Sequence, residues 1–195
     1  MLSAERSIRA VDWRNDWRTE GYRVTHAEKW LYRLDHPVLW HSGRPFPDDM
    51  AFTDAGGTRR LEITKDGAIT VLAGYAWDGC TPKVCLFDIL LGTPDGVVDT
   101  RTGRPKTYYA SLYHDALYQF LGTGLPLRRV TIDRFFLRLM TATDFRPRRL
   151  YFAAVRLFGN LFRRTAKYAP RNRGSRVPLE ASLATGQGDP VEVHA

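Results

Sequence analysis

The chain has 195 residues, of which 44% are hydrophobic, and these values are typical of one globular domain with a hydrophobic core. It contains no run of 18 or more apolar residues, so we expect no transmembrane segment, and its first residues predict no signal peptide. Two cysteines are too few for a disulfide framework, which favours a reducing, cytoplasmic compartment.

The net charge of +8 and the pI near 9.8 favour an anionic partner, either nucleic acid or an anionic lipid surface. Arginine supplies most of the positive charge and is concentrated between Arg128 and Arg173. We therefore expect the positive field to be strongest over the C-terminal third of the chain.

The first part of the chain predicts an arm followed by strands. Residues 1–20 are polar and are expected to form an N-terminal arm outside the domain. Short strand-like runs follow, at residues 30–34, 38–40, 61–64 and 68–72. Asp66-Gly67, between the last two alternating runs, is a strong signal for a β-hairpin. Residues 74–82 and 93–106 contain the glycines and prolines that are typical of loops.

The second part of the chain predicts three helices, over residues 107–121, 126–143 and 147–168. Pro126 suits the first turn of the second helix, and the short connection before it makes the first two helices antiparallel neighbours. Strands followed by helices predict a single α+β domain over residues 21–169, with an N-terminal β-hairpin or small antiparallel sheet, an antiparallel helical pair and a third, amphipathic helix. Residues 170–195 have few apolar side chains and predict a disordered tail.

A histidine and an aspartate on the two neighbouring helices are the main candidates for chemistry. The first helix is apolar or aromatic nearly all round, so His114 and Asp115 should be largely buried. Asp133 occupies the middle of an apolar stripe on the second helix. Its carboxylate is expected to reach His114, hold the imidazole in one tautomer and leave the other ring nitrogen free to act as a base. Tyr118 lies on the same face as His114, four residues further on.

Two interpretations of this pair are open. The residue pattern alone more often means a buried hydrogen bond that fixes the register of two helices than a catalytic site. Asp115 points away from the pair, and as a buried carboxylate it needs a cation, a metal ion or a hydrogen-bond donor. Asp78-Gly79 is, by itself, most often a plain turn.

Three features occur in a fixed order along the chain. They are Gly-Tyr-Ala-Trp-Asp-Gly-Cys-Thr-Pro at residues 74–82, His-Asp-Ala-Leu-Tyr at residues 114–118, and the side chains Arg129, Asp133, Phe136 and Met140. In order and spacing they resemble the phage- and prophage-associated domain of unknown function 1353, over about residues 22 to 159. The resemblance implies a compact α+β domain and a phage-associated protein, and it supplies no established activity.

The same residues also resemble the site of prokaryotic phospholipases A2, whose helix reads His-Asp-x-x-Tyr and follows a calcium loop similar to Asp78-Gly79-Cys80-Thr81. This resemblance implies that His114 is the general base that activates water, oriented by Asp133 and Tyr118. It further implies that Asp115, Asp78 and the carbonyl groups around Gly79 hold calcium. The calcium ion would polarise the ester carbonyl and stabilise the oxyanion.

The third predicted helix carries a basic stripe, because Arg149, Arg156 and Arg163 recur every seven residues beside an apolar face. A core-packing helix with a solvated basic face is the ordinary interpretation of this pattern. The functional interpretation is docking on an anionic lipid surface or on the phosphates of nucleic acid.

The sequence therefore leads to three functional hypotheses. The preferred one is a calcium-dependent ester hydrolase, similar to phospholipase A2 and acting on phospholipid. The second is a non-catalytic phage or prophage accessory protein whose His114–Asp133 pair is structural. The third is non-specific binding of nucleic acid through the arginine-rich end of the chain.

Overall fold

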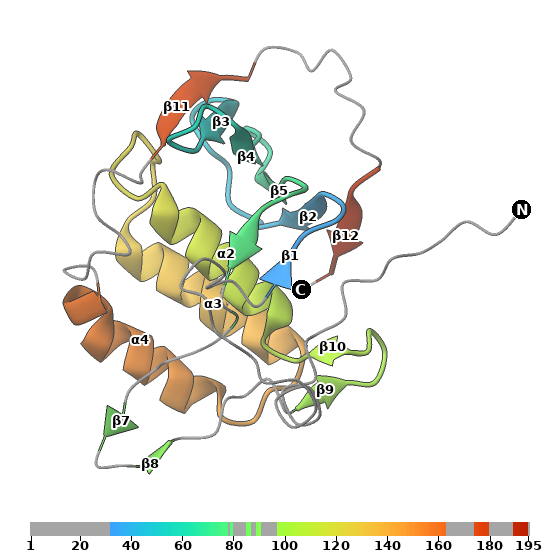
Figure 1. The fold of residues 1–195 in the computed structure, drawn as a ribbon, viewed down its shortest axis with the longest axis vertical. Helices are drawn as coiled ribbons and strands as arrows, with labels where there is room; N and C mark the ends of the chain where they lie inside the picture. The colour runs from blue at the N-terminus through green and yellow to red at the C-terminus, as the bar shows by residue number, and fades with distance from the viewer. Residues whose placement is uncertain are drawn as a thin grey trace, which may run out of the picture.

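The computed structural model describes residues 32–77, 79, 85–86, 89–90, 97–162, 174–179 and 189–194. The expected arm at residues 1–20 lies outside these residues. The fold is α+β, with a six-stranded sheet on one side and three helices on the other (Figure 1). None of the helices in the described part of the chain combines the length and the apolarity needed to cross a membrane.

The main sheet has the strand order β11-β3-β4-β5-β2-β12. Its neighbouring strands are antiparallel except at the β2–β12 edge, where they are parallel. In chain order its strands are β2 (Val38–His41), β3 (Met50–Thr53), β4 (Arg59–Ile63), β5 (Ala68–Val71), β11 (Ser175–Pro178) and β12 (Val191–Val193). Three two-stranded pairs lie outside it: β1 (Tyr32–Arg33) with β6 (Ala76–Trp77), β7 (Cys85–Leu86) with β8 (Ile89–Leu90), and β9 (Val98–Asp99) with β10 (Arg104–Pro105).

The helices are α2 (Tyr108–Gln119), α3 (Arg129–Ala142) and α4 (Arg148–Phe162). Aromatic side chains join the first two to the sheet. The buried Trp40 ring of β2 lies 5.4 Å from the Tyr113 ring of α2 and 5.1 Å from the Phe135 ring of α3. Phe52 of β3 meets Phe120 just after α2, with ring centroids 5.2 Å apart. Figure 1 shows α4 on the far side of α3 from the sheet, so α3 has a neighbour on both sides.

The hairpin and the helices confirm the predicted α+β order. β4 and β5 pair around the turn that ends at Gly67, whose N–H donates to the carbonyl of Thr64 at 3.0 Å. The second helix begins at Arg129 rather than near Pro126, because the preceding segment is extended and buries both Leu125 and Leu127. The expected loops at 74–82 and 93–106 contain the short strands β6, β9 and β10.

The C-terminal segment differs from the prediction of a disordered tail over residues 170–195. β11 pairs with β3 and β12 pairs with β2, so two described segments of the tail cover both edges of the sheet. The physical reason is backbone pairing, because β3 and β2 would otherwise present rows of unpaired N–H and C=O groups. Arg176 adds an ion pair with Asp48, at 3.1 Å.

The hairpin turn generates a stability prediction. Gly67 has a φ of +98°, and a Cβ placed on it would lie 2.6 Å from the backbone oxygen of Arg44. We expect Gly67→Ala to reduce the free energy of unfolding by about 2–4 kcal/mol, because both the left-handed backbone and the contact are unfavourable. Gly57→Ala is the matched control, since Gly57 has a φ of +79° but open space around it, and should cost about 1–2 kcal/mol. Equal losses in urea denaturation would contradict the role of the Arg44 contact.

Candidate functional site

Asp133 lies in the middle of α3, and its side chain has 0% exposure. The helix buries it because Phe136 and Met140, three and seven residues further on the same face, pack into the core. An ionised carboxylate in such a position costs several kcal/mol, roughly, unless charged or hydrogen-bonding partners compensate it. The partners of Asp133 therefore define the site.

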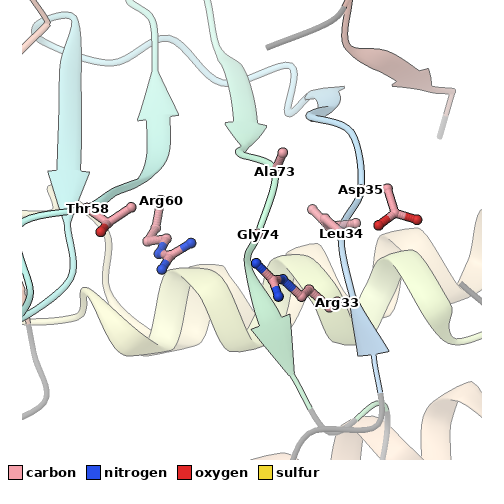
Figure 2. A pocket seen from close by; sticks show the side chains of 7 residues that line it. All are labelled: Arg33, Leu34, Asp35, Thr58, Arg60, Ala73 and Gly74. Atoms are coloured by element: carbon pink, nitrogen blue, oxygen red, sulfur yellow. The ribbon is translucent and has the colours of Figure 1, made fainter. Parts of the chain in front are cut away.

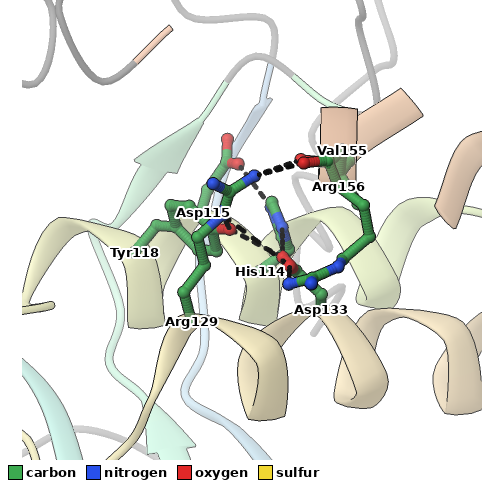
Figure 3. A network of polar contacts seen from close by, with 7 residues as sticks. All are labelled: His114, Asp115, Tyr118, Arg129, Asp133, Val155 and Arg156. Carbon is green, nitrogen blue, oxygen red and sulfur yellow. Dashed lines mark hydrogen bonds and ion pairs between the residues drawn. The ribbon is translucent and has the colours of Figure 1, made fainter. Parts of the chain in front are cut away.

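Those partners come from all three helices (Figure 3). Tyr118 of α2 donates its hydroxyl to Oδ1 of Asp133 at 2.6 Å, and Nε2 of His114 lies 3.4 Å from the same oxygen. Arg156 of α4 donates from Nη1 to Oδ2 at 3.2 Å, and Nε of Arg129 lies 3.8 Å from that oxygen. Both carboxylate oxygens are thus occupied, one from α2 and the other by guanidinium groups.

Arg129 connects the same site to the backbone of α4. Its Nε donates to the Tyr118 hydroxyl at 2.8 Å. Its Nη2 donates to the carbonyl oxygens of Val155, at 2.6 Å, and Arg156, at 3.0 Å. The arginine therefore fixes the tyrosine that binds Asp133 and attaches α4 to the helix pair.

His114 is held between rings and carboxylates. Its imidazole lies against Tyr118 and Phe136, with ring centroids 4.3 Å and 4.8 Å away. Nε2 faces Asp133, whereas Nδ1 lies 3.7 Å from Oδ1 of Asp115, beyond ordinary hydrogen-bond length. The His114 side chain is 14% exposed and that of Asp115 is 20% exposed, so both groups reach solvent in part.

The carboxylates decide the protonation of His114. Burial alone lowers the pKa of His114, but the two neighbouring carboxylates of Asp115 and Asp133 outweigh it and leave that pKa above its ordinary value. Burial raises the pKa of Asp133, yet His114, Tyr118 and Arg156 more than offset this, and the pKa is lowered. Asp133 is therefore the permanent anion of the site.

Asp115 has the opposite balance. Burial raises the pKa of Asp115, and the attraction of His114 offsets this only in part. Burial also raises the pKa of Tyr118, followed by its hydrogen bond to Asp133, so the phenol stays neutral and donates its proton. Asp115 is thus the carboxylate of the site whose charge is least compensated.

The structure brings five of the sequence-predicted site residues together, namely His114, Asp115, Tyr118, Asp133 and Arg156. Asp78 and Arg163 lie outside the described residues, and Gly79 is buried with a φ of +72°. Within the described ranges, no cluster of three His, Cys, Asp or Glu side chains has the geometry of a metal site.

The predicted basic stripe is divided by the structure. Arg149 is exposed, whereas Arg156 engages Asp133. Sequence reasoning did not find the part that Arg156 and Arg129 play, because α4 carries no signal for which of its arginines turns towards a carboxylate on another helix. The four-residue spacing of Arg129 and Asp133 was the one available signal.

The opposite pKa shifts predict how stability depends on pH. Because the folded state binds the His114 proton more tightly than the unfolded chain does, this contribution is complete below about pH 6.5 and is lost as the pH rises through the raised pKa of folded His114. Asp133 stabilises the fold above about pH 3.8, and this contribution is lost as the pH falls through its lowered pKa. In urea unfolding, the free energy of unfolding of the wild type should therefore decrease from pH 5.5 to 9, and this decrease should be smaller in His114→Gln. His41→Gln, at an exposed site, should keep the wild-type dependence; an unchanged profile in His114→Gln would contradict the assignment.

Comparisons with protein-family models, curated proteins and solved structures found no match to this chain. The resemblances to the phage-associated domain family and to phospholipases A2 therefore remain proposals. So do the anionic lipid and nucleic-acid partners.

Proposed function

We propose that the chain is an ester hydrolase in which His114 is the general base. The observation that carries this proposal is the orientation of the imidazole, which directs Nε2 at the buried Asp133 and leaves Nδ1 3.7 Å from Oδ1 of Asp115, beyond hydrogen-bond length, in a side chain that is 14% exposed. A neutral histidine that donates Nε2–H to Asp133 has its lone pair on Nδ1. The 3.4 Å separation is long for a hydrogen bond, as is common in catalytic sites without substrate.

In the proposed reaction, Nδ1 of His114 takes a proton from a water molecule as the water oxygen attacks the acyl carbon. The resulting tetrahedral intermediate collapses, the bond to the alcohol oxygen breaks, and the imidazolium returns the proton to that oxygen. Asp133 holds the neutral imidazole in the tautomer that is protonated on Nε2, and it stabilises the imidazolium that forms during the reaction. Tyr118 and Arg129 orient Asp133. These three are positioning residues.

Calcium is part of this proposal through Asp115. A hard divalent cation takes oxygen ligands, and the incompletely compensated carboxylate of Asp115 would supply one beside the imidazole. The resemblance adds Asp78 and the loop at Gly79 as further ligands. When bound, calcium supplies a Lewis acid for the ester carbonyl.

Hydrolysis of a short-chain phospholipid or a nitrophenyl ester in the presence of calcium tests the base. His114→Ala is expected to reduce the rate at least about a hundredfold, the usual scale of general-base catalysis. The wild-type rate should rise with pH through the raised pKa of His114, because the unprotonated imidazole is the active form. His41→Ala is the control, and a wild-type protein that hydrolyses neither ester would refute the proposal.

Titration calorimetry with calcium tests Asp115 separately. We expect calcium binding that Asp115→Asn abolishes, because the amide keeps the shape of the carboxylate and removes its charge. Asp144→Asn, which changes an exposed carboxylate after α3, should bind calcium as the wild type does. Binding that is absent, or equal in Asp115→Asn and wild type, would remove calcium from the proposal.

A non-catalytic phage or prophage accessory protein is the second candidate, and one observation favours it. Asp133 joins α2, α3 and α4, and such a network stabilises the packing of three helices without any reaction. In that case His114→Ala, which strands part of the Asp133 carboxylate, should cost about 1–3 kcal/mol of unfolding free energy while no ester is hydrolysed by the wild type.

A further inference from the structure

A pocket of about 530 Å³ lies beside the strand pair β1–β6, and two arginines line it (Figure 2). Arg33 belongs to β1 and Arg60 to β4, so the pocket joins the small strand pair to the main sheet. The N–H of Gly74 donates to the carbonyl of Leu34 at 2.7 Å, which draws the segment before β6 against β1. None of the proposed catalytic side chains lines this pocket.

Gly74 allows the two guanidinium groups to approach one point of the backbone. Its φ is +79°, and a Cβ built on it would lie 3.0 Å from Nη1 of Arg60 and 3.7 Å from Nη2 of Arg33. Both distances are measured from the same point, so the two like charges are close neighbours. An anion that contacts both groups would reduce their mutual repulsion.

Arg60 is already oriented by the protein. Its Nε donates to Oδ2 of Asp54 at 2.8 Å, and Asp54 also accepts the N–H groups of Gly56 and Thr58. Burial raises the pKa of Asp54, but these hydrogen bonds outweigh it and keep the pKa below its ordinary value. Asp54 is therefore ionised and holds Nε of Arg60, which leaves the terminal nitrogens directed at the pocket.

No described carboxylate compensates the second arginine. Arg33 is exposed and has no ion pair among the residues that the structure covers. Asp35 also lines the pocket, but Figure 2 shows it on the opposite side of Leu34 from both guanidinium groups. The part of the pocket that the two guanidinium groups line is consequently positive, and Thr58, another lining residue, adds a neutral hydroxyl donor.

We propose that this pocket binds the phosphate group of a phosphomonoester between Arg33 and Arg60. Guanidinium groups recognise phosphate because their parallel N–H donors match its oxygens, and here Arg33 adds a positive charge while Arg60, held by Asp54, adds oriented donors. The chemistry is the same for a small soluble phosphomonoester and for the headgroup of phosphatidic acid. The inference concerns binding alone and is independent of ester hydrolysis at His114.

The test uses the full chain at low salt with three probes: inorganic phosphate, glycerol 3-phosphate, and phosphatidylcholine vesicles with and without phosphatidic acid. Calorimetry measures the soluble probes and co-sedimentation measures the vesicles. Arg33→Gln is expected to weaken binding about tenfold or more, the loss of one charge-assisted contact. Arg33→Lys should lose less, since lysine keeps the charge without the paired donors. Arg134→Gln, on the exposed face of α3, removes the same charge elsewhere and should bind as the wild type does.

Two outcomes support the proposal and distinguish the source of the phosphate. Arg33-dependent binding of phosphate or glycerol 3-phosphate indicates a soluble phosphomonoester, whereas Arg33-dependent binding of phosphatidic acid vesicles alone indicates a lipid headgroup. The absence of binding to all three probes overturns it. So does an equal loss in Arg33→Gln and Arg134→Gln, because that result would reflect overall charge and not the pocket.

Discussion

The buried carboxylate of Asp133 is the constraint on which the helical half of this protein depends. A charge with no exposed surface must find its partners inside the fold, and here α2 and α4 supply its hydrogen bonds while Arg129 of α3 adds an ion pair. Arg129, on α3 itself, continues the network to the carbonyl groups of α4. The position of α4 is therefore set by directional polar contacts as well as by apolar packing.

The same network gives the site an unequal distribution of charge. The guanidinium groups of Arg156 and Arg129 contact Oδ2 of Asp133. The Tyr118 hydroxyl and the His114 imidazole contact Oδ1. The lowered pKa of Asp133 and the raised pKa of His114 favour the charged pair, carboxylate and imidazolium, over the pair in which both groups are neutral. An imidazole with a raised pKa is a stronger base, but it is unprotonated only towards higher pH. The raised pKa therefore reduces the fraction of molecules whose His114 is unprotonated and active at neutral pH.

Patterns within one segment allowed much of the fold to be predicted, and contacts between distant segments accounted for most of the rest. Asp66-Gly67 predicted the β4–β5 hairpin, and Asp133 in an apolar stripe predicted a carboxylate facing the neighbouring helix. The strands β11 and β12 were missed because their short polar sequences pair only where the sheet offers an open edge. The Arg33–Arg60 pocket had no sequence signal, because the sheet and the Gly74 turn bring these side chains together.

The way in which the sheet is completed also constrains the order of events during synthesis. Val38 pairs with Val191, and Met50 pairs with Pro178, so both edge strands leave the ribosome long after the strands that they cover. The growing chain can assemble β2 to β5 and pack α2 and α3 on them before either edge is covered. During that interval both edges are templates for pairing with another nascent chain. Slow translation between α4 and β12 would lengthen the interval in which such association competes with folding.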